Sequence, residues 1–404
     1  MNMNERGIDL LPGYMLILWA FVLPWSIAAM QIVMGFVVIS SIIVALSDQR
    51  SPLKYHLYYL FPLLYLLSGL VSVMRTADKV YSFGSMFHTD WVILLVPFLA
   101  SMIIPDQQKK TAIRVLLISA TISGIYGIIQ FFDGMEYFRN EPLRMLGNYY
   151  RAVGGYGSFF AFGGNQLFAF SFAIVCLIGV KKWNRERIIL LIASIIIFLS
   201  IIASQTRSAW LGMMFIILLG TYLANKKYFI LAVSGLLIGS VVLFFSLPDI
   251  QSRFTSIFDF SQNAARLNIW KTSLAIFKEN PVFGIGYGNF DTFFEIFKVP
   301  GYYDAKGHAH NDFLNIAVHN GVIGLFTWLG MWGAWFYYAI RAFRQAERTE
   351  FEKTVLLSGI LAIAGILVGA LFQCYYTDLE NNIFWWFMAM FGLQIFTRDN
   401  RIKT

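Results

Sequence analysis

The sequence predicts an all-α, polytopic membrane protein, and three observations lead to this fold class. The 404 residues are 58% hydrophobic and only 13% charged. The mean hydropathy of +0.62 would give a water-soluble chain of this length a large exposed apolar surface. The apolar residues also fall in runs suited to helices that cross a hydrocarbon core, which takes about 20 residues.

About twelve such runs are expected to be transmembrane helices, separated by short segments that hold charges and prolines. They cover residues 11–23, 27–46, 55–73, 91–104, 111–131, 158–180, 188–204, 209–223, 228–247, 313–340, 354–373 and 383–396. The first two meet at Pro24 without a charged loop, and the first, fourth and eighth are short. These are expected to be tilted, re-entrant or shielded helices, which leaves a count of eleven open.

The chain has no low-complexity linker, no repeat at a fixed period and no soluble domain of ordinary size. Residues 1–404 are therefore expected to form a single integral membrane domain. Two longer segments stand out as external loops, the large one at residues 248–311 and a second one at residues 132–157.

An amphipathic helix is predicted within the large loop. Its polar start is Asn263, its stop is Asn280 followed by Pro281, and it is expected to lie against the membrane face. The apolar residues at helical spacing that predict it are Leu267, Trp270, Leu274 and Phe277.

Basic residues are distributed unevenly between the two sets of connecting segments. With the N-terminus in the cytoplasm, 19 of the 31 lysines and arginines fall in short cytoplasmic segments. They are Arg6, Arg50, Lys54, Lys109, Lys110, Arg114, Lys181, Lys182, Arg185, Arg187, Lys226, Lys227, Arg341, Arg344, Arg348, Lys353, Arg398, Arg401 and Lys403. Both termini are therefore predicted to be cytoplasmic. Because this bias explains most of the net charge of +8, we expect membrane lipids as partners and no nucleic acid.

Three elements place a permanent positive charge or an imidazole at the external ends of apolar helices. Arg207 lies in TRSAWLG between two apolar runs, and Arg266 lies in AARLNIW on the amphipathic helix. The third element, GHAHNDFLNIAVHNGVIG, holds three of the five histidines, His308, His310 and His319. Its Gly321 and Gly324 are expected to permit close helix packing.

Each element also has a plainer structural interpretation. An arginine at a helix end can extend its charge to the lipid headgroups, a basic residue on an amphipathic helix can contact lipid phosphates, and a lone histidine can cap a helix. His308 and His310 could ligate one metal ion together, but no acidic cluster with ligand spacing accompanies them, so no metal site is expected. The glycines of GIGYG lack the spacing and the preceding strand of a dinucleotide fingerprint, so no cofactor is expected. Cys176 and Cys374 are expected to be packing residues without a disulfide.

The third element carries a family resemblance. His310 and Asn311, nine further residues, and Gly321-Val322-Ile323-Gly324 resemble the H-[NSQ]-x9-G-x-x-G signature of the bacterial O-antigen ligase and polymerase superfamily. The upstream RLNIWKTSLAIFKENPVFGIGYGNF resembles the large periplasmic loop of that family, and TRSAWLG its arginine-bearing helix start. The resemblance thus spans residues 205–325.

A further stretch, RAVGGYGSFFAFGGNQLFAF, is similar to a family segment that often reads glycine-small-Phe-x-Asn-Pro-Asn. The chain departs from it by lacking the proline. Arg151 and Asn165 lie in this stretch, and Arg151 is a candidate substrate-binding residue.

The resemblance implies a GT-C-type glycosyltransferase in the bacterial inner (plasma) membrane, with an active site facing the periplasm or cell exterior. The donor would be a glycan linked to undecaprenyl pyrophosphate. Arg207 and Arg266 would bind the pyrophosphate bidentately and neutralise its developing charge. His310 would be the general base, because an imidazole with a reference pKa near 6.5 can accept a proton from a sugar hydroxyl at neutral pH. His308 and Asn311 would help to bind substrate.

The same reaction predicts inversion at the anomeric carbon and independence from metal. The first external turn, LPWSI, has no carboxylate, and the chain has no D-x-D. The leading hypothesis for the acceptor is lipid A-core oligosaccharide, as in a ligase, and the alternative is another lipid-linked glycan, as in a polymerase. A transporter or flippase of lipid-linked sugars would instead need paired discontinuous helices near the membrane midplane, whereas the informative residues here gather at the external face.

Overall fold

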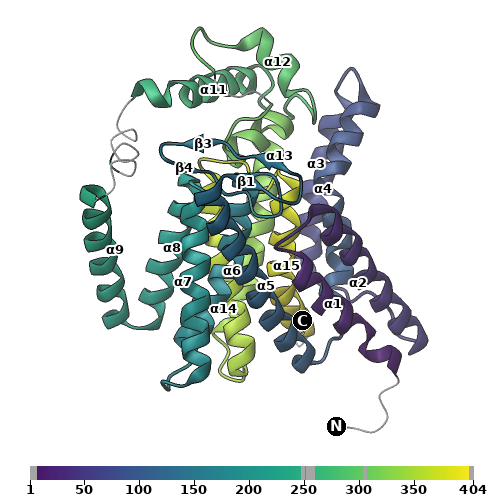
Figure 1. Ribbon diagram of the computed structural model, residues 1–404. Coiled ribbons are helices and arrows are strands. Elements are labelled where there is room, and N and C mark those ends of the chain that lie inside the picture. Colours follow the sequence, from purple (N-terminus) through teal and green to yellow (C-terminus); the bar gives the residue numbers. More distant parts are fainter. Residues whose placement is uncertain (1–6, 247–250, 252–259, 304–306, 400–404) are drawn as a thin grey trace.

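The computed structural model describes residues 7–246, 251, 260–303 and 307–399, and within them the chain forms a bundle of long helices (Figure 1). The predicted all-α, multi-pass membrane fold is confirmed, because ten helices in this part of the chain are long and apolar enough to cross a membrane. They are α2 (Ile27–Ser47), α3 (Leu60–Met74, preceded by η2, Leu57–Tyr59), α4 (Lys79–Ser101), α5 (Asp106–Asp133), α6 (Phe159–Gly179), α7 (Arg185–Ala203), α8 (Arg207–Ala224), α9 (Lys226–Ser246), α13 (Asp312–Phe343) and α14 (Glu350–Ala370).

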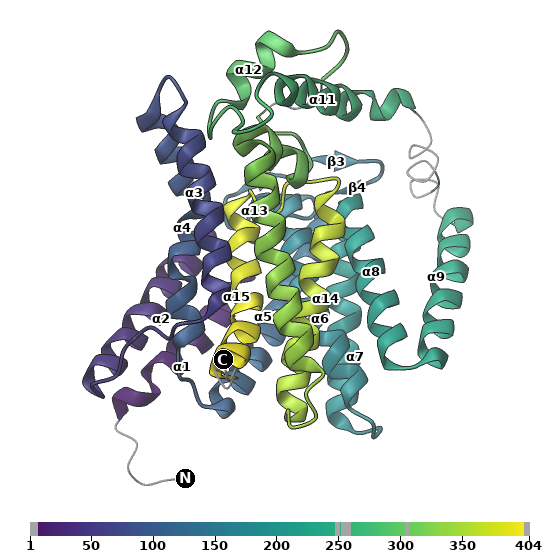
Figure 2. The same ribbon diagram turned by 180° about the vertical axis from the view of Figure 1, so that it is seen from behind.

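Two of the predicted membrane runs correspond to helices that are not among these ten. Helix α1 (Leu11–Val22), after the short η1 (Gly7–Leu10), has 12 residues, which rise only about 18 Å. Helix α15 (Leu379–Phe396) has nearly all its residues buried by protein, including the polar Asn381, Asn382 and Gln394. Figure 2 shows it beside α13 and α14 in the middle of the bundle.

Helix α4 begins well before the predicted fourth run at residues 91–104. The Asp78 side chain accepts a hydrogen bond from the backbone N–H of Tyr81 and so caps the helix at Lys79. The added turns contain polar residues that a search for apolar runs rejects, among them His88 and Asp90. Asp90 is 1% exposed, so its polarity is accommodated by protein partners rather than by water.

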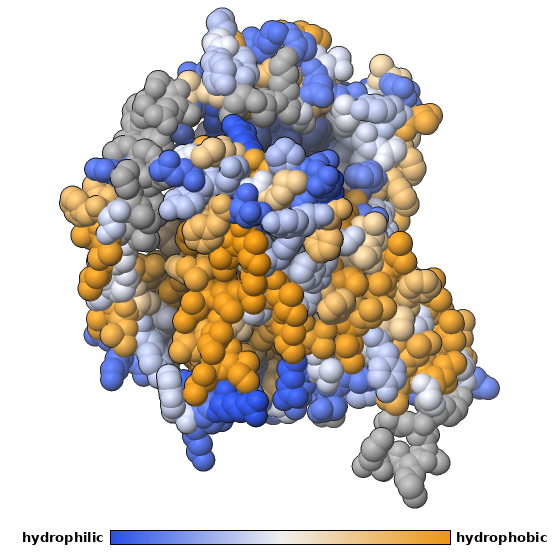
Figure 3. Space-filling view, in the orientation of Figure 1, coloured by the Kyte–Doolittle hydropathy of each residue, from blue (hydrophilic) through white to orange (hydrophobic). Residues whose placement is uncertain are grey.

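On the face shown in Figure 3, an apolar band lies between two hydrophilic ends of the bundle. One end carries α11 (Phe260–Glu279), α12 (Phe290–Phe297) and two short hairpins, and the other carries the N-terminus and the α6–α7 turn (Figure 1). The far ends of α4 and α15 also meet, since Gln394 Nε2 donates to the Leu99 carbonyl at 3.0 Å. We refer to the end with α11 and α12 as the cap end.

Both predicted external loops lie at the cap end and contain structure that the sequence did not predict. Residues 132–157 hold two antiparallel hairpins, in which Met135 pairs with Pro142 and Met145 pairs with Tyr150. Their strands are β1 (Met135–Glu136), β2 (Glu141–Pro142), β3 (Met145–Leu146) and β4 (Tyr149–Tyr150). In the large loop, α12 is likewise an addition to the predicted helix. Residues 248–250, 252–259 and 304–306 of that loop lie outside the described residues.

Helix α11 covers the segment predicted as a helix, but its most deeply buried apolar residues are not those of the predicted stripe. Ile269 and Ile276 are fully buried and pack in a small core with Phe290 and Phe294 of α12. Leu274, from the predicted apolar stripe, is 47% exposed instead. The difference arises because α12 and the start of α13 cover one side of α11, and the sequence pattern does not reveal this second partner.

The charge bias gives a topology that can be tested on the two ends of this bundle. In a variant without Cys176 and Cys374, we expect a membrane-impermeant maleimide to label Lys278→Cys on α11 but not Lys182→Cys in the α6–α7 turn when it is added to intact spheroplasts. Both positions are exposed, so access to the reagent depends on the side of the membrane. Labelling of both residues, or of Lys182→Cys alone, would contradict the assignment.

Candidate functional site

The start of α13 orients the histidine pair. Asn311 caps the helix by accepting a hydrogen bond from the backbone N–H of Leu314, and its side-chain amide donates to the Leu371 carbonyl at 2.9 Å. The preceding residue, His310, has a left-handed backbone with φ of 49°, which is uncommon outside glycine and often marks functional sites. The Asn311 helix cap thus fixes the direction of α13 and the position of the His310 side chain just before it.

His310 lies in a buried polar environment made by His308 and Gln373. His310 Nδ1 is 3.1 Å from Gln373 Oε1, and the two imidazole centroids are 4.1 Å apart. The backbone N–H of His310 donates to His308 Nδ1. Burial, with smaller contributions from the neighbouring His310, His319 and Arg266, lowers the pKa of His308 to about 3, so His308 is neutral at physiological pH.

The segment between α14 and α15, residues 371–378, is held against α13 by one carboxylate. Asp312 is fully buried and accepts hydrogen bonds from the backbone N–H groups of Tyr375, Tyr376 and Thr377 at 2.7, 2.7 and 3.0 Å. The Thr377 hydroxyl adds a fourth, at 2.9 Å. This clamp places Gln373 beside His310. Sequence reasoning missed Asp312 and Gln373, because an acid in a first helical turn and a glutamine at a helix end are common features.

Arg207 joins this group from α8. Its neighbour Ser208 shares a 2.8 Å hydrogen bond with the Tyr375 hydroxyl, which connects the start of α8 to the segment that carries Gln373. The guanidinium Nη2 of Arg207 is 3.5 Å from Asn263 Oδ1 on α11. Arg207 therefore lies between the membrane helices and the part of the cap end that is formed by α11 and α12, which we call the cap.

Arg266 is three residues after Asn263 and so lies on the same side of α11. It is close enough to His308 and Tyr375 for its charge to oppose protonation of the first and favour ionisation of the second. The predicted residues Arg207, Arg266, His308 and His310 are thus brought together although they come from three separate parts of the chain. Figure 3 shows a hollow between the cap and the bundle on this end of the molecule.

Arg151 lies beside the turn that leads into α8. Its Nε and Nη2 donate to the carbonyl groups of Ser204 and Gln205 at 3.4 and 3.2 Å. Its guanidinium also lies 5.5 Å from the centroid of the Phe160 ring, whose centroid is 6.5 Å from that of His310. Arg151 therefore borders the same site.

Asn165, from the same sequence stretch, has a different setting inside the bundle. Its amide donates to the Glu380 carbonyl, and its oxygen accepts a hydrogen bond from Asn381 at 2.9 Å. Both contacts join α6 to α15. Asn165 is therefore a packing residue in this structure.

The glycines of the signature mark a break in α13 where the cap attaches to the bundle. Gly321 has φ of 67°, and a Cβ there would lie 2.2 Å from the Val282 carbonyl oxygen. Across the break, Val322 N–H donates to the Pro281 carbonyl, and Ile285 N–H donates to that of Val318. The close packing expected at Gly321 therefore involves the backbone of residues 281–286 rather than another helix.

Tyr287 extends this attachment into the bundle. Its hydroxyl donates to Asp90 Oδ2 at 2.6 Å and accepts from Asn320 Nδ2 at 2.7 Å. Its ring stacks on His319 with centroids 5.9 Å apart, so His319 has a packing role at this attachment. A buried polar network of this kind is stabilising only while each member keeps its partners.

Removing the Tyr287 hydroxyl should therefore destabilise the protein. In Tyr287→Phe we expect a loss of about 1–3 kcal/mol in unfolding free energy, because Asp90 and Asn320 are left with buried, unpaired groups. Denaturant unfolding of the purified protein in detergent measures the change. Tyr302→Phe is the matched control, since Tyr302 is 69% exposed in the same cap. Equal stability of the two variants would mean that the hydroxyl does not anchor the cap.

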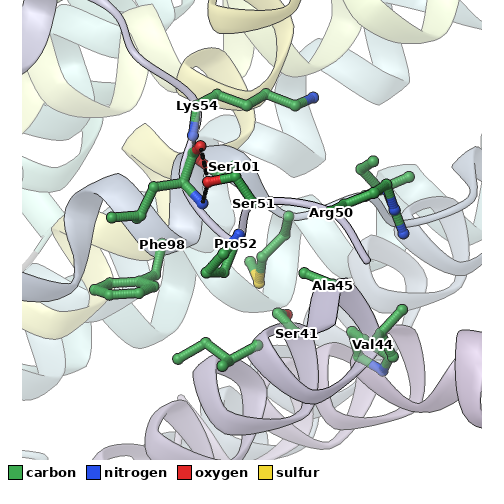
Figure 4. Close-up of a pocket in the computed structure, with 14 residues that line it drawn as sticks. Ser41, Val44, Ala45, Arg50, Ser51, Pro52, Lys54, Phe98 and Ser101 are labelled. Atoms are coloured by element: carbon green, nitrogen blue, oxygen red, sulfur yellow. Dashed lines mark hydrogen bonds between the residues drawn. The ribbon is translucent and has the colours of Figure 1, made fainter. Parts of the chain in front are cut away.

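A separate pocket of about 180 Å³ lies at the opposite end of the bundle, between α2, residues 50–54 and the end of α4 (Figure 4). The Lys54 backbone N–H donates to Ser101 Oγ at its edge. None of the predicted site residues lines it, so it is not part of the candidate site.

Cys176 and Cys374 are not bonded to each other. Within the described ranges, no three His, Cys, Asp or Glu side chains gather as a metal site would require.

Comparison with known proteins agrees with this geometry. Residues 192–329 match the family described as O-antigen ligase, and the match includes Arg207, Arg266, both site histidines and the two signature glycines. An uncharacterised protein of Haemophilus influenzae is 23% identical over 352 residues, which cover 81% of this chain and 83% of the relative. The resemblance of the signature to the O-antigen ligase and polymerase superfamily is therefore confirmed by the family match over residues 192–329.

Proposed function

We propose that the protein transfers a glycan from undecaprenyl pyrophosphate to an acceptor hydroxyl at the periplasmic face of the bacterial inner membrane. The observation that carries the proposal is the convergence of Arg207, Arg266 and His310 at the cap end of the bundle. The ligase and polymerase family supports this type of activity. The glycan, the acceptor and the stereochemistry are part of the proposal.

Arg207 and Arg266 would act on the leaving group. As the bond between the anomeric carbon and the pyrophosphate oxygen breaks, negative charge develops on the pyrophosphate, and two guanidiniums can neutralise it through charge-assisted hydrogen bonds. Both arginines border the space between cap and bundle, where water is partly excluded and such interactions are strong. Arg151 and Asn311 would contact the substrate at the edge of this site.

His310 would act on the acceptor. Its imidazole takes the proton of the acceptor hydroxyl while the oxygen attacks the anomeric carbon from the side opposite the pyrophosphate, which inverts the configuration. Undecaprenyl pyrophosphate leaves with the electron pair of the broken bond. His308 would contribute contacts rather than proton transfer, since its lowered pKa makes it a weak base.

A ligase acting on lipid A-core oligosaccharide is our leading assignment, and a polymerase acting on a lipid-linked repeat unit is the alternative. The two are distinguished by incubating purified protein with undecaprenyl-pyrophosphate glycan and each acceptor, and recording product length. One glycan per acceptor is expected of a ligase, and a ladder of lengths of a polymerase. Movement of the lipid-linked sugar across proteoliposomes without transfer would replace both with a flippase.

We also propose that transfer needs no divalent metal. Two arginines can supply the positive charge that many glycosyltransferases obtain from a divalent metal ion. Transfer should therefore continue at an undiminished rate in a chelator. The measurement compares initial rates in EDTA and after addition of Mg²⁺, Mn²⁺ or Ca²⁺. Complete loss in EDTA that a divalent ion restores would contradict the proposal.

A further inference from the structure

A neutral histidine can act as a base through only one of its ring nitrogens. The other nitrogen carries the hydrogen, and its hydrogen-bond partner decides which tautomer is populated. His310 has such a partner, since its Nδ1 is 3.1 Å from Gln373 Oε1. An amide oxygen only accepts hydrogen bonds, so this contact requires the hydrogen on Nδ1 and makes Nε2 the basic nitrogen.

The contact is shielded from water, which would otherwise compete for both groups. His310 is 8% exposed and Gln373 is 3% exposed. The neighbouring His308 does not replace the glutamine, because its Nδ1 already accepts the backbone N–H of His310. The Gln373 oxygen is therefore the acceptor that faces Nδ1 of His310.

The position of Gln373 is fixed on both sides along the chain. Before it, the Leu371 carbonyl accepts from Asn311, the cap of α13. After it, Asp312 accepts from three consecutive backbone N–H groups that begin at Tyr375. Asn311 and Asp312, which directly follow His310, thus hold the segment that carries Gln373. The same contacts therefore position both the His310 imidazole and the Gln373 amide.

We propose that Gln373 is a positioning residue that holds His310 in the Nδ1–H tautomer and so presents the Nε2 lone pair to the acceptor hydroxyl. In the transfer step the hydroxyl proton moves to Nε2 and the acceptor oxygen bonds to the anomeric carbon. The resulting imidazolium keeps its Nδ1–H donated to the Gln373 oxygen. The catalytic role of this tautomer rests on the proposed function. The tautomer itself follows from the contact between His310 and Gln373 alone.

Nitrogen NMR of ¹⁵N-histidine-labelled protein in nanodiscs reports the tautomer directly. The chain has five histidines, and His310→Gln identifies the resonances of His310. We expect a protonated Nδ1 and an unprotonated Nε2 in the parent protein, and loss of this preference in Gln373→Met, which has similar volume but no acceptor oxygen. A parent protein with the hydrogen on Nε2, or a tautomer unchanged in Gln373→Met, would overturn the inference.

The pH dependence of transfer gives a second readout that a purely structural glutamine would not alter. In Gln373→Glu, the carboxylate keeps the acceptor but stabilises the protonated imidazolium, so the acid limb of the rate profile should move to higher pH by roughly 1–3 units. The rate on the plateau should be retained. In Gln373→Met we expect kcat to fall roughly 2- to 10-fold, with the donor KM unchanged.

Gln394→Met is the matched control, because Gln394 is also a buried glutamine with a backbone hydrogen bond but lies at the opposite end of the bundle. It should leave the tautomer and the pH profile as in the parent. An acid limb that does not move in Gln373→Glu would count against the positioning role. Full activity of His310→Gln would refute the base assignment instead, while the NMR result would still stand.

Discussion

His310→Gln should lower transfer by roughly 10²- to 10⁴-fold, the usual range for lost general-base assistance. Glutamine can form hydrogen bonds from the same position but cannot take a proton at neutral pH, so it tests proton transfer separately from contact. His310→Ala should be at least as inactive. Donor binding should remain nearly intact in both, because the imidazole is assigned to the acceptor. Initial rates at saturating acceptor, together with donor titrations, provide the measurement.

The other histidines of the signature are controls within the same segment. His319 packs against Tyr287 and Phe290, so His319→Ala should reduce stability more than turnover. His308→Ala should have an intermediate effect, since it removes the acceptor for the His310 backbone N–H. Near-normal turnover of His310→Gln would reduce the imidazole to a positioning role. A turnover defect confined to His319→Ala would mean that the wrong histidine had been assigned.

Much of this arrangement follows from local sequence features, because apolar runs and a positive-inside bias report directly on membrane helices. The close packing predicted at Gly321 is present, although its partner is the backbone of residues 281–286 and not a helix. Its spacing has a structural reason, since the nine intervening residues separate the histidine from the break in α13 where residues 281–286 attach. Arg207, Arg266, His308 and His310 could be proposed as site residues because each lies in a segment that resembles the family.

What the sequence did not reveal depends on contacts between distant segments. Gln373 and Asp312 acquire their roles only when residues 371–378 fold against α13, and a glutamine after an apolar run looks like part of that run. The extension of α4 was missed because Asp90 is accommodated in the helix by remote partners such as Tyr287, which is 197 positions away. The buried face of α11 was misassigned because its partner, α12, was not predicted. In each case the deciding neighbour is remote in sequence.

Replacing both Arg207 and Arg266 with alanine should nearly abolish transfer and donor binding together. One lost charged hydrogen bond costs about 1.5–3 kcal/mol, so each single variant should lose roughly 10- to 150-fold in affinity for undecaprenyl pyrophosphate. Arg→Lys should restore only part of this, because an ammonium keeps the charge but lacks the planar fork. Calorimetric titration of the purified variants with undecaprenyl pyrophosphate measures the loss.

The double variant distinguishes a shared ligand from two independent effects. Arg207 contacts Asn263, which precedes Arg266 by three residues on α11. If both arginines bind one pyrophosphate, the double variant should lose less than the sum of the two single losses, with a coupling of about 0.5–3 kcal/mol. Arg144→Ala provides the control, since this arginine is exposed in the hairpin loop at the same end of the molecule and a general loss of positive charge would affect it equally. Strictly additive losses would place the two arginines on separate groups of the substrate. Unchanged donor affinity in both single variants would remove them from the leaving-group site altogether.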